Sequence, residues 1–167
     1  MMVYYVDESA TPLGPIALAS DGRALRALEF ADAAHLERAL RRRFPGASVE
    51  RADDPQDFTA SVRAYFAGDV RALQGLPADG DGTPFQRRVW SELRRIEPGE
   101  TCSYGALAAR LGLPRASRAV GLANGRNPVA LVVPCHRVIG SDGRLTGYAA
   151  GVERKRWLLA HEGALLA

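Results

Sequence analysis

Cys135 and His136 are the residues of this chain whose types and spacing could do chemistry. A thiolate is a strong nucleophile, and its population rises when a neighbouring base or cation lowers the pKa of the thiol. Cys135 follows closely on the apolar run 129–133, which predicts a buried strand. This position favours a nucleophile at a strand end, with His136 as its base. A free cysteine is also commonly a small buried hydrophobe, and we interpret Cys102 in that way.

The segments of the first half predict a small sheet with helices. Short apolar runs at 3–6, 16–19 and 25–30 are separated by Gly, Pro and Asp, which indicates strands of an antiparallel sheet. Residues 33–43 are predicted as a helix with an arginine-rich polar face, and residues 56–67 as a helix with an apolar stripe.

The second half predicts a mainly helical unit. Thr83, Pro84 and Gln86 form a capping-box pattern, and the helix that follows is expected to end by Pro98. Two short helices over 103–111 and about 115–124, joined by a Gly-containing turn, form a helix-turn-helix pattern, which ordinary helical packing also produces. A last helix is predicted over about 152–162.

The charge divides unevenly along the 167 residues. Residues 1–80 carry a net charge of −3 and residues 81–167 a net charge of +6. The Gly-, Asp- and Pro-rich stretch 68–83 separates them, so we predict domains over 1–80 and 81–167. A basic half suggests a polyanionic partner, although a solvated basic face is the alternative. Small residues around Arg118 would let that helix lie close to a groove.

Several classes of protein are disfavoured by composition. No apolar stretch approaches the roughly 20 residues that span a bilayer, and the N-terminus lacks a basic-then-apolar leader. Two cysteines do not build a disulfide scaffold, and with three scattered histidines they do not make a convincing zinc site. We therefore expect a soluble, cytoplasmic protein that does not bind membranes.

Five blocks in the second half resemble one known family. They are GTPFQRRVW (82–90), GETCSYGALA (99–108), RAVGLANGRNP (118–128), PCHRVIG (134–140) and LTGYAAGVERKRWLLAHEG (145–163). In this order they resemble the O6-alkylguanine-DNA alkyltransferases, and TPLGPIALA (11–19) matches more loosely. The resemblance implies an α+β fold. A small ribonuclease-H-like sheet-plus-helix scaffold precedes a mainly helical domain with a helix-turn-helix and a short strand leading to the cysteine.

The resemblance also implies roles for four residues around the thiol. Cys135 corresponds to the alkyl acceptor, and His136, acting through a water, to its base. Glu162 corresponds to the group that orients the histidine, and Asn127 to the asparagine that braces the turn carrying the cysteine. The set is a Cys-His-acid arrangement for activating a nucleophile.

A second group of residues resembles the family's guanine pocket. Tyr104 would hydrogen-bond guanine N3, and the Val138 carbonyl, with that of Cys135, would accept from the guanine amine. The Ala149 backbone would donate to O6. Tyr148 would close the pocket wall, and Ser141 would lie near a phosphate or base on the lesion side.

Binding and chemistry follow from the same resemblance. Arg118 corresponds to an arginine finger that fills the gap left by an extruded nucleotide, with Ser117 and Ala119 flanking it in the minor groove. The partner would be double-stranded DNA carrying O6-alkylguanine, and O4-alkylthymine is left open. The thioether product implies one event per molecule, without metal or soluble cofactor. We expect a monomer, and no transcription-regulator role because the chain has no room for an extra zinc domain.

Three other functions compete with alkyl transfer. An alkyltransferase-like protein would bind the lesion without removing it, but such relatives lack the reactive cysteine, which Cys135 supplies here. A Cys-His hydrolase would have no use for Arg118 on a helix of small residues. A plain helix-turn-helix regulator would leave the intact PCHRV segment unexplained.

Overall fold

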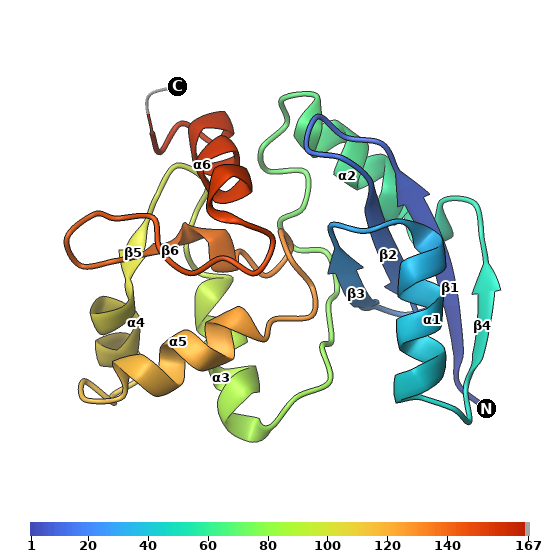
Figure 1. The fold of residues 1–167 in the computed structure, drawn as a ribbon, viewed down its shortest axis with the longest axis horizontal. Helices are drawn as coiled ribbons and strands as arrows, with labels where there is room; N and C mark the ends of the chain where they lie inside the picture. The colour runs from blue at the N-terminus through green and yellow to red at the C-terminus, as the bar shows by residue number, and fades with distance from the viewer. Residues whose placement is uncertain (166–167) are drawn as a thin grey trace. The chain divides into compact units, whose positions relative to one another are not determined.

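The computed structural model describes residues 1–165, and the chain separates into two compact units, residues 1–81 and 82–167. The first is a sheet flanked by helices and the second is mainly helical, so the fold is mixed α+β (Figure 1). None of the helices within the described part of the chain is long and apolar enough to cross a membrane.

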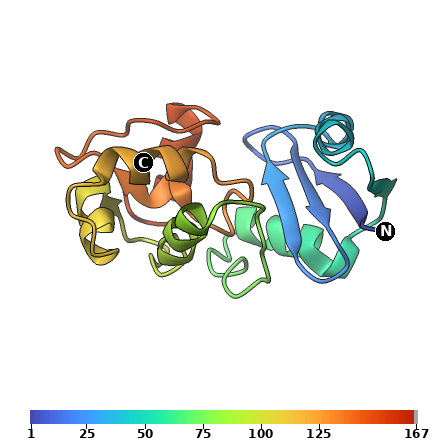
Figure 2. The same cartoon turned by 90° about the horizontal axis from the view of Figure 1, so that it is seen from below.

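The first unit is built on a four-stranded sheet of order β3-β2-β1-β4. Its elements are β1 (Val3–Ser9), β2 (Ile16–Ser20), β3 (Leu25–Glu29), α1 (Ala33–Arg43), β4 (Ser48–Arg51), the 3₁₀ turn η1 (Pro55–Asp57) and α2 (Phe58–Phe66). Helices α1 and α2 cover opposite faces of the sheet (Figures 1 and 2). All five residues of β2 are buried because the central strands are covered on both sides.

The sequence missed one strand of this sheet. β1, β2 and β3 pair antiparallel as predicted, but β4 pairs parallel with β1, so the sheet is mixed. Its four residues are Ser-Val-Glu-Arg, with one apolar side chain and no buried position. It is therefore held mainly by backbone pairing to β1, and no hydrophobic alternation marks it.

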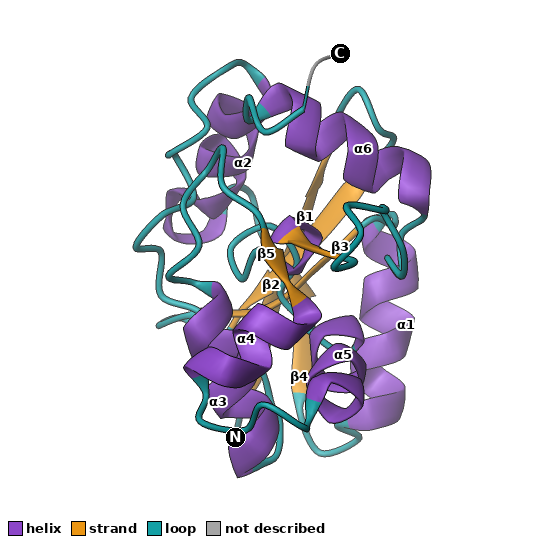
Figure 3. Cartoon of the chain, turned by 90° about the vertical axis from the view of Figure 1, so that its left-hand side faces the viewer, coloured by secondary structure: helices purple, strands orange, loops and turns teal. Residues whose placement is uncertain are grey.

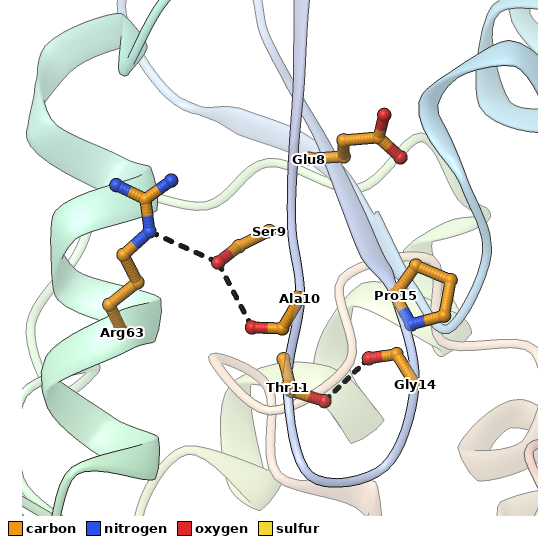
Figure 4. A pocket seen from close by; sticks show the side chains of 7 residues that line it. All are labelled: Glu8, Ser9, Ala10, Thr11, Gly14, Pro15 and Arg63. Atoms are coloured by element: carbon orange, nitrogen blue, oxygen red, sulfur yellow. Dashed lines mark hydrogen bonds between the residues drawn. The ribbon is translucent and has the colours of Figure 1, made fainter.

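The side chains at one end of this sheet line an open cavity of about 450 Å³ (Figure 4). The Arg63 Nε of α2 donates a 3.1 Å hydrogen bond to Oγ of Ser9, and the Thr11 hydroxyl donates to the Gly14 carbonyl across the β1–β2 turn. These contacts tie α2 to the end of β1 and close the hairpin.

Helices dominate the second unit, together with one short pair of strands (Figure 3). Its elements are α3 (Pro84–Leu93), β5 (Cys102–Ser103), α4 (Tyr104–Arg110), α5 (Ser117–Gly125), the 3₁₀ turn η2 (Cys135–Arg137), β6 (Val138–Ile139) and α6 (Val152–His161). The predicted capping box at Thr83 and Gln86 is present, and Ser103 caps α4. Helix α3 ends at Leu93, before Pro98, and α5 packs against both α3 and α4.

The predicted strand over 129–133 is wrong. The segment is buried but turns back on itself, since the Val133 N–H donates to the Val129 carbonyl at 3.0 Å and Leu131 has a positive φ of 70°. Asn127 is the physical reason: its side chain accepts from Val129 N–H at 3.0 Å and donates to the Val133 carbonyl at 2.7 Å. Both ends of the segment are thereby drawn around one amide, which an extended strand does not allow.

Candidate active site

Cys135 opens the 3₁₀ turn η2, directly after the turn that Asn127 holds together. Its side chain is almost buried, with the residue 7% exposed. Burial raises the pKa of the Cys135 thiol, while a hydrogen bond from the Asn127 side chain and the charge of Lys155 act in the lowering direction. The thiol is therefore neutral at rest, and groups that favour its thiolate lie beside it.

His136 and Glu162 are brought together from positions 26 residues apart. His136 Nε2 lies 2.9 Å from Oε2 of Glu162, which follows directly on α6, and both side chains are fully buried. Burial lowers the pKa of His136 against the raising effect of the Glu162 carboxylate, so the imidazole is neutral. Because Nε2 faces the carboxylate it carries the proton, and Nδ1 presents a lone pair. Nδ1 has no hydrogen-bond partner within residues 1–165.

Arg137 binds the same carboxylate, and the sequence reasoning missed it. Its Nε and Nη2 donate to the two oxygens of Glu162 at 2.8 and 2.9 Å. Burial raises the pKa of Glu162, but the hydrogen bond from His136, the charge that this ring carries once acid protonates it, and the bonds and charge of Arg137 outweigh burial and lower that pKa to about 2. The signal in the sequence was an arginine inside an otherwise buried segment.

Lys155 is the second charged residue that the sequence reasoning missed. It is fully buried on α6, and its Nζ donates to the Thr146 carbonyl at 2.9 Å. Burial lowers the pKa of Lys155, and interaction with Cys135 raises it. Lys155 is the single lysine of the chain, and it lies three residues before the buried Leu158. Because residues three apart share one face of a helix, this spacing could have indicated an inward side chain.

Tyr104 is placed near the thiol by the short strand pair. β5 pairs parallel with β6, so the start of α4 lies beside the segment that follows η2. The Tyr104 hydroxyl donates to the Thr146 carbonyl at 3.3 Å, and its ring lies beside Gly121, where an added Cβ would be in ordinary van der Waals contact at 3.5 Å. Burial, and then the neighbouring Cys135, raise the pKa of Tyr104.

The other residues predicted for the pocket divide into two groups. Val138 is buried in β6, and Tyr148 is half-buried with a hydroxyl that has no partner within residues 1–165. Burial, and then the charges of Cys135 and Glu162, raise the pKa of Tyr148 well above its ordinary value. Ser141 and Ala149 lie exposed on the loop between β6 and α6.

The residues predicted to meet DNA lie at the start of α5. Arg118 and Ala119 are exposed, and Ser117 is half-buried. The buried far side of the helix carries Asn124, whose side chain donates to the Cys135 carbonyl at 3.4 Å. Helix α5 therefore joins an exposed arginine to the backbone of the cysteine turn, and Asn124 is a further residue that the sequence reasoning missed.

These groups form a site for a nucleophilic thiol. It has a sulfur, a neutral imidazole fixed by a carboxylate, and a lysine and two tyrosines near the sulfur. Within the described part of the chain, no cluster of three or more His, Cys, Asp or Glu is arranged to hold a metal ion. The chemistry available to these residues is attack by a thiolate on an electrophile, with proton transfer to His136.

Comparison with known proteins identifies the family. The family model described as "6-O-methylguanine DNA methyltransferase, ribonuclease-like domain" matches residues 3–79, and "6-O-methylguanine DNA methyltransferase, DNA binding domain" matches residues 84–164. A methylated-DNA--protein-cysteine methyltransferase from Shigella flexneri is 48% identical over 164 residues, 96% of each chain.

Solved structures from Mycobacterium tuberculosis are also similar. Its O6-methylguanine methyltransferase is 41% identical with a TM-score of 0.78, covering 98% of this chain and 94% of that one. A second structure, of the M. tuberculosis OGT in complex with DNA, is 42% identical with a TM-score of 0.77, covering 97% and 93%. Because family models and relatives cover nearly the whole length at this identity, the chain belongs to the 6-O-methylguanine DNA methyltransferase family.

Proposed function

We propose that this protein repairs DNA by transferring the alkyl group of O6-alkylguanine to the sulfur of Cys135, once per molecule. The observation that carries the assignment to Cys135 is the buried contact between His136 Nε2 and Glu162, beside a thiol that Asn127 and Lys155 favour as a thiolate. Family membership supplies the reaction, methyl transfer from DNA to a protein cysteine.

Each residue of the site has a separate role in this reaction. His136 takes the thiol proton at Nδ1 through a water, and Glu162 stabilises the imidazolium that forms. The sulfur lone pair attacks the alkyl carbon, the carbon–O6 bond breaks, and guanine leaves with the electron pair. Tyr104 donates to guanine N3 as negative charge develops on the base, while the Val138 carbonyl and the Ala149 N–H hold the amine and O6. Tyr148 closes the pocket wall, and Ser141 lies toward the DNA backbone.

The substrate base must leave the duplex before a buried sulfur can reach it. In our proposal α4 and α5 act as a helix-turn-helix that enters the minor groove, with Ser117 and Ala119 against its walls. Arg118 fills the gap left by the extruded nucleotide. DNA is the partner expected from the family's DNA-binding domain and from a relative solved in complex with DNA. Most contacts would be to phosphates, so binding should weaken steeply with salt.

The remaining assignments complete this proposal. The first unit serves as a ribonuclease-H-like scaffold, and the second carries DNA binding and transfer. The proposed protein is a cytoplasmic monomer. It needs no metal or soluble cofactor, because a thiol, an imidazole and a carboxylate suffice for a displacement at carbon.

Mass spectrometry after incubation with an O6-methylguanine duplex tests the proposal. Cleavage after arginine places Cys135 in the peptide 127–137 and Cys102 in the peptide 96–110, so the two thiols are read separately. We expect one added methyl group on peptide 127–137, at most one per molecule, and none in Cys135→Ser. Methyl on peptide 96–110 would overturn the assignment of the acceptor. Binding of the lesion without modification would instead identify a lesion-binding protein that does not transfer.

A further inference from the structure

The guanidinium of Arg137 is buried against the site with all three of its nitrogens engaged. The residue is 4% exposed. Two nitrogens grip the carboxylate of Glu162, and Nη1 donates to the Ile96 carbonyl, just beyond the end of α3, at 2.6 Å. A fork of parallel N–H bonds fixes both the position and the rotation of a carboxylate, which a point charge does not. Arg137 therefore anchors Glu162 to the turn η2 and to the segment that follows α3.

This anchoring determines which oxygen His136 meets. Glu162 Oε2 accepts from Arg137 Nη2 at 2.9 Å and from His136 Nε2 at 2.9 Å, whereas Oε1 is taken by Arg137 Nε. The carboxylate is thus held at the distance and angle that keep the His136 proton on Nε2. The lone pair of the ring is then left on Nδ1, the atom that has no partner within residues 1–165.

The same contact sets the charge around the imidazole. The charged groups that act on His136 are Glu162 and Lys155, from α6 and its end, and Arg137 from its own turn. From the side of α3 comes the uncharged Ile96 carbonyl. A bare carboxylate beside His136 would favour the imidazolium, which cannot accept a proton. Paired with Arg137, Glu162 presents a nearly neutral pair instead.

We propose that Arg137 is a positioning residue for methyl transfer: its fork on Glu162 keeps His136 neutral, with Nδ1 as the acceptor for the Cys135 proton. This inference rests on the proposed function, because it concerns the base of that reaction. It goes beyond the thiol, imidazole and carboxylate by making their geometry depend on a fourth buried side chain.

The test is the pH dependence of single-turnover transfer to an O6-methylguanine duplex, in wild type, Arg137→Met, Arg137→Lys and Arg95→Met. Arg95 is an exposed arginine of the same unit, paired only at the surface with Glu92, so it controls for loss of one positive charge. We expect Arg137→Met to slow transfer about 10- to 100-fold, by analogy with the loss seen when the partner that orients a metal-ligating histidine is removed. Its rate profile should also shift to higher pH, because fewer His136 rings are neutral.

Nitrogen-15 NMR of the imidazoles gives a readout independent of transfer, and the chain has three histidines to assign. We expect His136 to be protonated at Nε2 in wild type and in Arg95→Met, and to be a mixture of tautomers in Arg137→Met. Arg137→Lys restores the charge but not the fork. Its rate profile should therefore return toward that of wild type while the tautomers remain mixed.

The outcomes separate the inference from the proposed function. Some outcomes would show that Arg137 has a structural role alone. In these, its variants keep the wild-type midpoint of the rate–pH profile and the wild-type tautomer of His136, and lose only rate or melting temperature. If Arg137→Met does not fold, a pure Nε2 tautomer in Arg137→Lys overturns the inference in its place. A wild-type protein that leaves Cys135 unmodified refutes the proposed function instead, and the NMR result still decides how Arg137 acts on His136.

Discussion

The two units bury different kinds of polar side chain. Within residues 1–165, the buried polar residues of the first unit are the hydroxyl residues Ser9, Ser20 and Thr59. Those of the second unit are Asn124, His136, Arg137, Lys155 and Glu162, four of which can carry charge. Burying a charge is unfavourable unless it is paired and hydrogen-bonded, and even then an apolar pair of the same volume is often more stable. The charged cluster therefore lies in the unit to which we assign the chemistry.

The core of the first unit is apolar instead. Its core on the α1 face is made mostly of small and medium apolar residues, such as Val6, Ala17, Leu36 and Leu40, together with the aromatic ring of Tyr4. These alternate along the strands and recur at helical spacing, which is the pattern that folding by hydrophobic burial requires. Comparing the rate and stability effects of the same substitution in both units thus separates residues that stabilise the fold from residues that take part in the reaction.

Replacing a histidine should show the largest contrast. We expect His136→Gln to slow methyl transfer by about 10²- to 10⁴-fold, the usual contribution of a general base. The matched variant His35→Gln alters an exposed histidine of the first unit, 3.8 Å from Glu29, and should leave the rate unchanged. Single-turnover assays on an O6-methylguanine duplex give both rates. Equal rates in the two variants would remove His136 from the mechanism.

The contrast explains which parts of the fold were predictable. The α1 helix was predicted with the bounds it has, since an Asp32 cap, apolar periodicity and arginines in its last turn all agree. The β4 strand escaped prediction because backbone pairing rather than side-chain pattern defines it. Segment 129–133 was predicted as a strand from its apolar composition. That composition indicates burial, but it does not show that Asn127 bonds both the Val129 N–H and the Val133 carbonyl.

The site was predictable only as far as residue type and resemblance reach. The resemblance paired His136 with Glu162, and the two side chains touch. Arg137 and Lys155 were counted among the basic residues of a solvated or DNA-facing surface, yet both are buried. Long charged side chains are exposed in most proteins, so local pattern assigns them to the surface. Arg137 is paired with a carboxylate 25 residues away, and Lys155 with a carbonyl of the loop that precedes its helix, nine residues away.

Neutralising a buried carboxylate should have the next largest effect. We expect Glu162→Gln to lower the free energy of unfolding by about 3 to 5 kcal/mol, because the buried charge of Arg137 loses its opposite charge. Glu37→Gln removes a carboxylate of the first unit that pairs with half-exposed arginines, and should lose about 1 kcal/mol or less. Urea titration at neutral pH compares the two losses.

The advantage of wild type over Glu162→Gln should also depend on pH. The folded pKa of Glu162, about 2, lies below its ordinary value of 4.5, so its stabilising effect is complete above 4.5. The difference in unfolding free energy should therefore shrink as pH falls from about 4.5 toward 2. A difference that stays constant across this window would mean that Glu162 does not titrate with a depressed pKa.

Removing the exposed arginine of α5 should have a smaller effect that depends on the substrate. We expect Arg118→Ala to slow transfer from a duplex about tenfold or more, because filling the gap of an extruded base offsets a few kcal/mol of unstacking. Reaction with free O6-alkylguanine, which needs no extrusion, should be nearly unchanged. Arg38→Ala, at an exposed position on α1 of the first unit, is the matched control. If both substrates slow equally in Arg118→Ala, the arginine acts on the pocket rather than on the duplex.

The smallest effect belongs to a buried hydroxyl of the first unit. Thr59 is fully buried and donates to Oδ2 of Asp7 at 2.7 Å. Burial raises the pKa of Asp7, but hydrogen bonds from Thr59 and from the Asp54 and Glu8 backbone lower it below the ordinary value. We expect Thr59→Val to lower the unfolding free energy by about 1 kcal/mol, with Thr59→Ser closer to wild type. Transfer from a duplex should proceed at the wild-type rate in both. A variant that stays folded by circular dichroism yet transfers more slowly would mean that the first unit takes part in the reaction, because this hydroxyl supports only its fold.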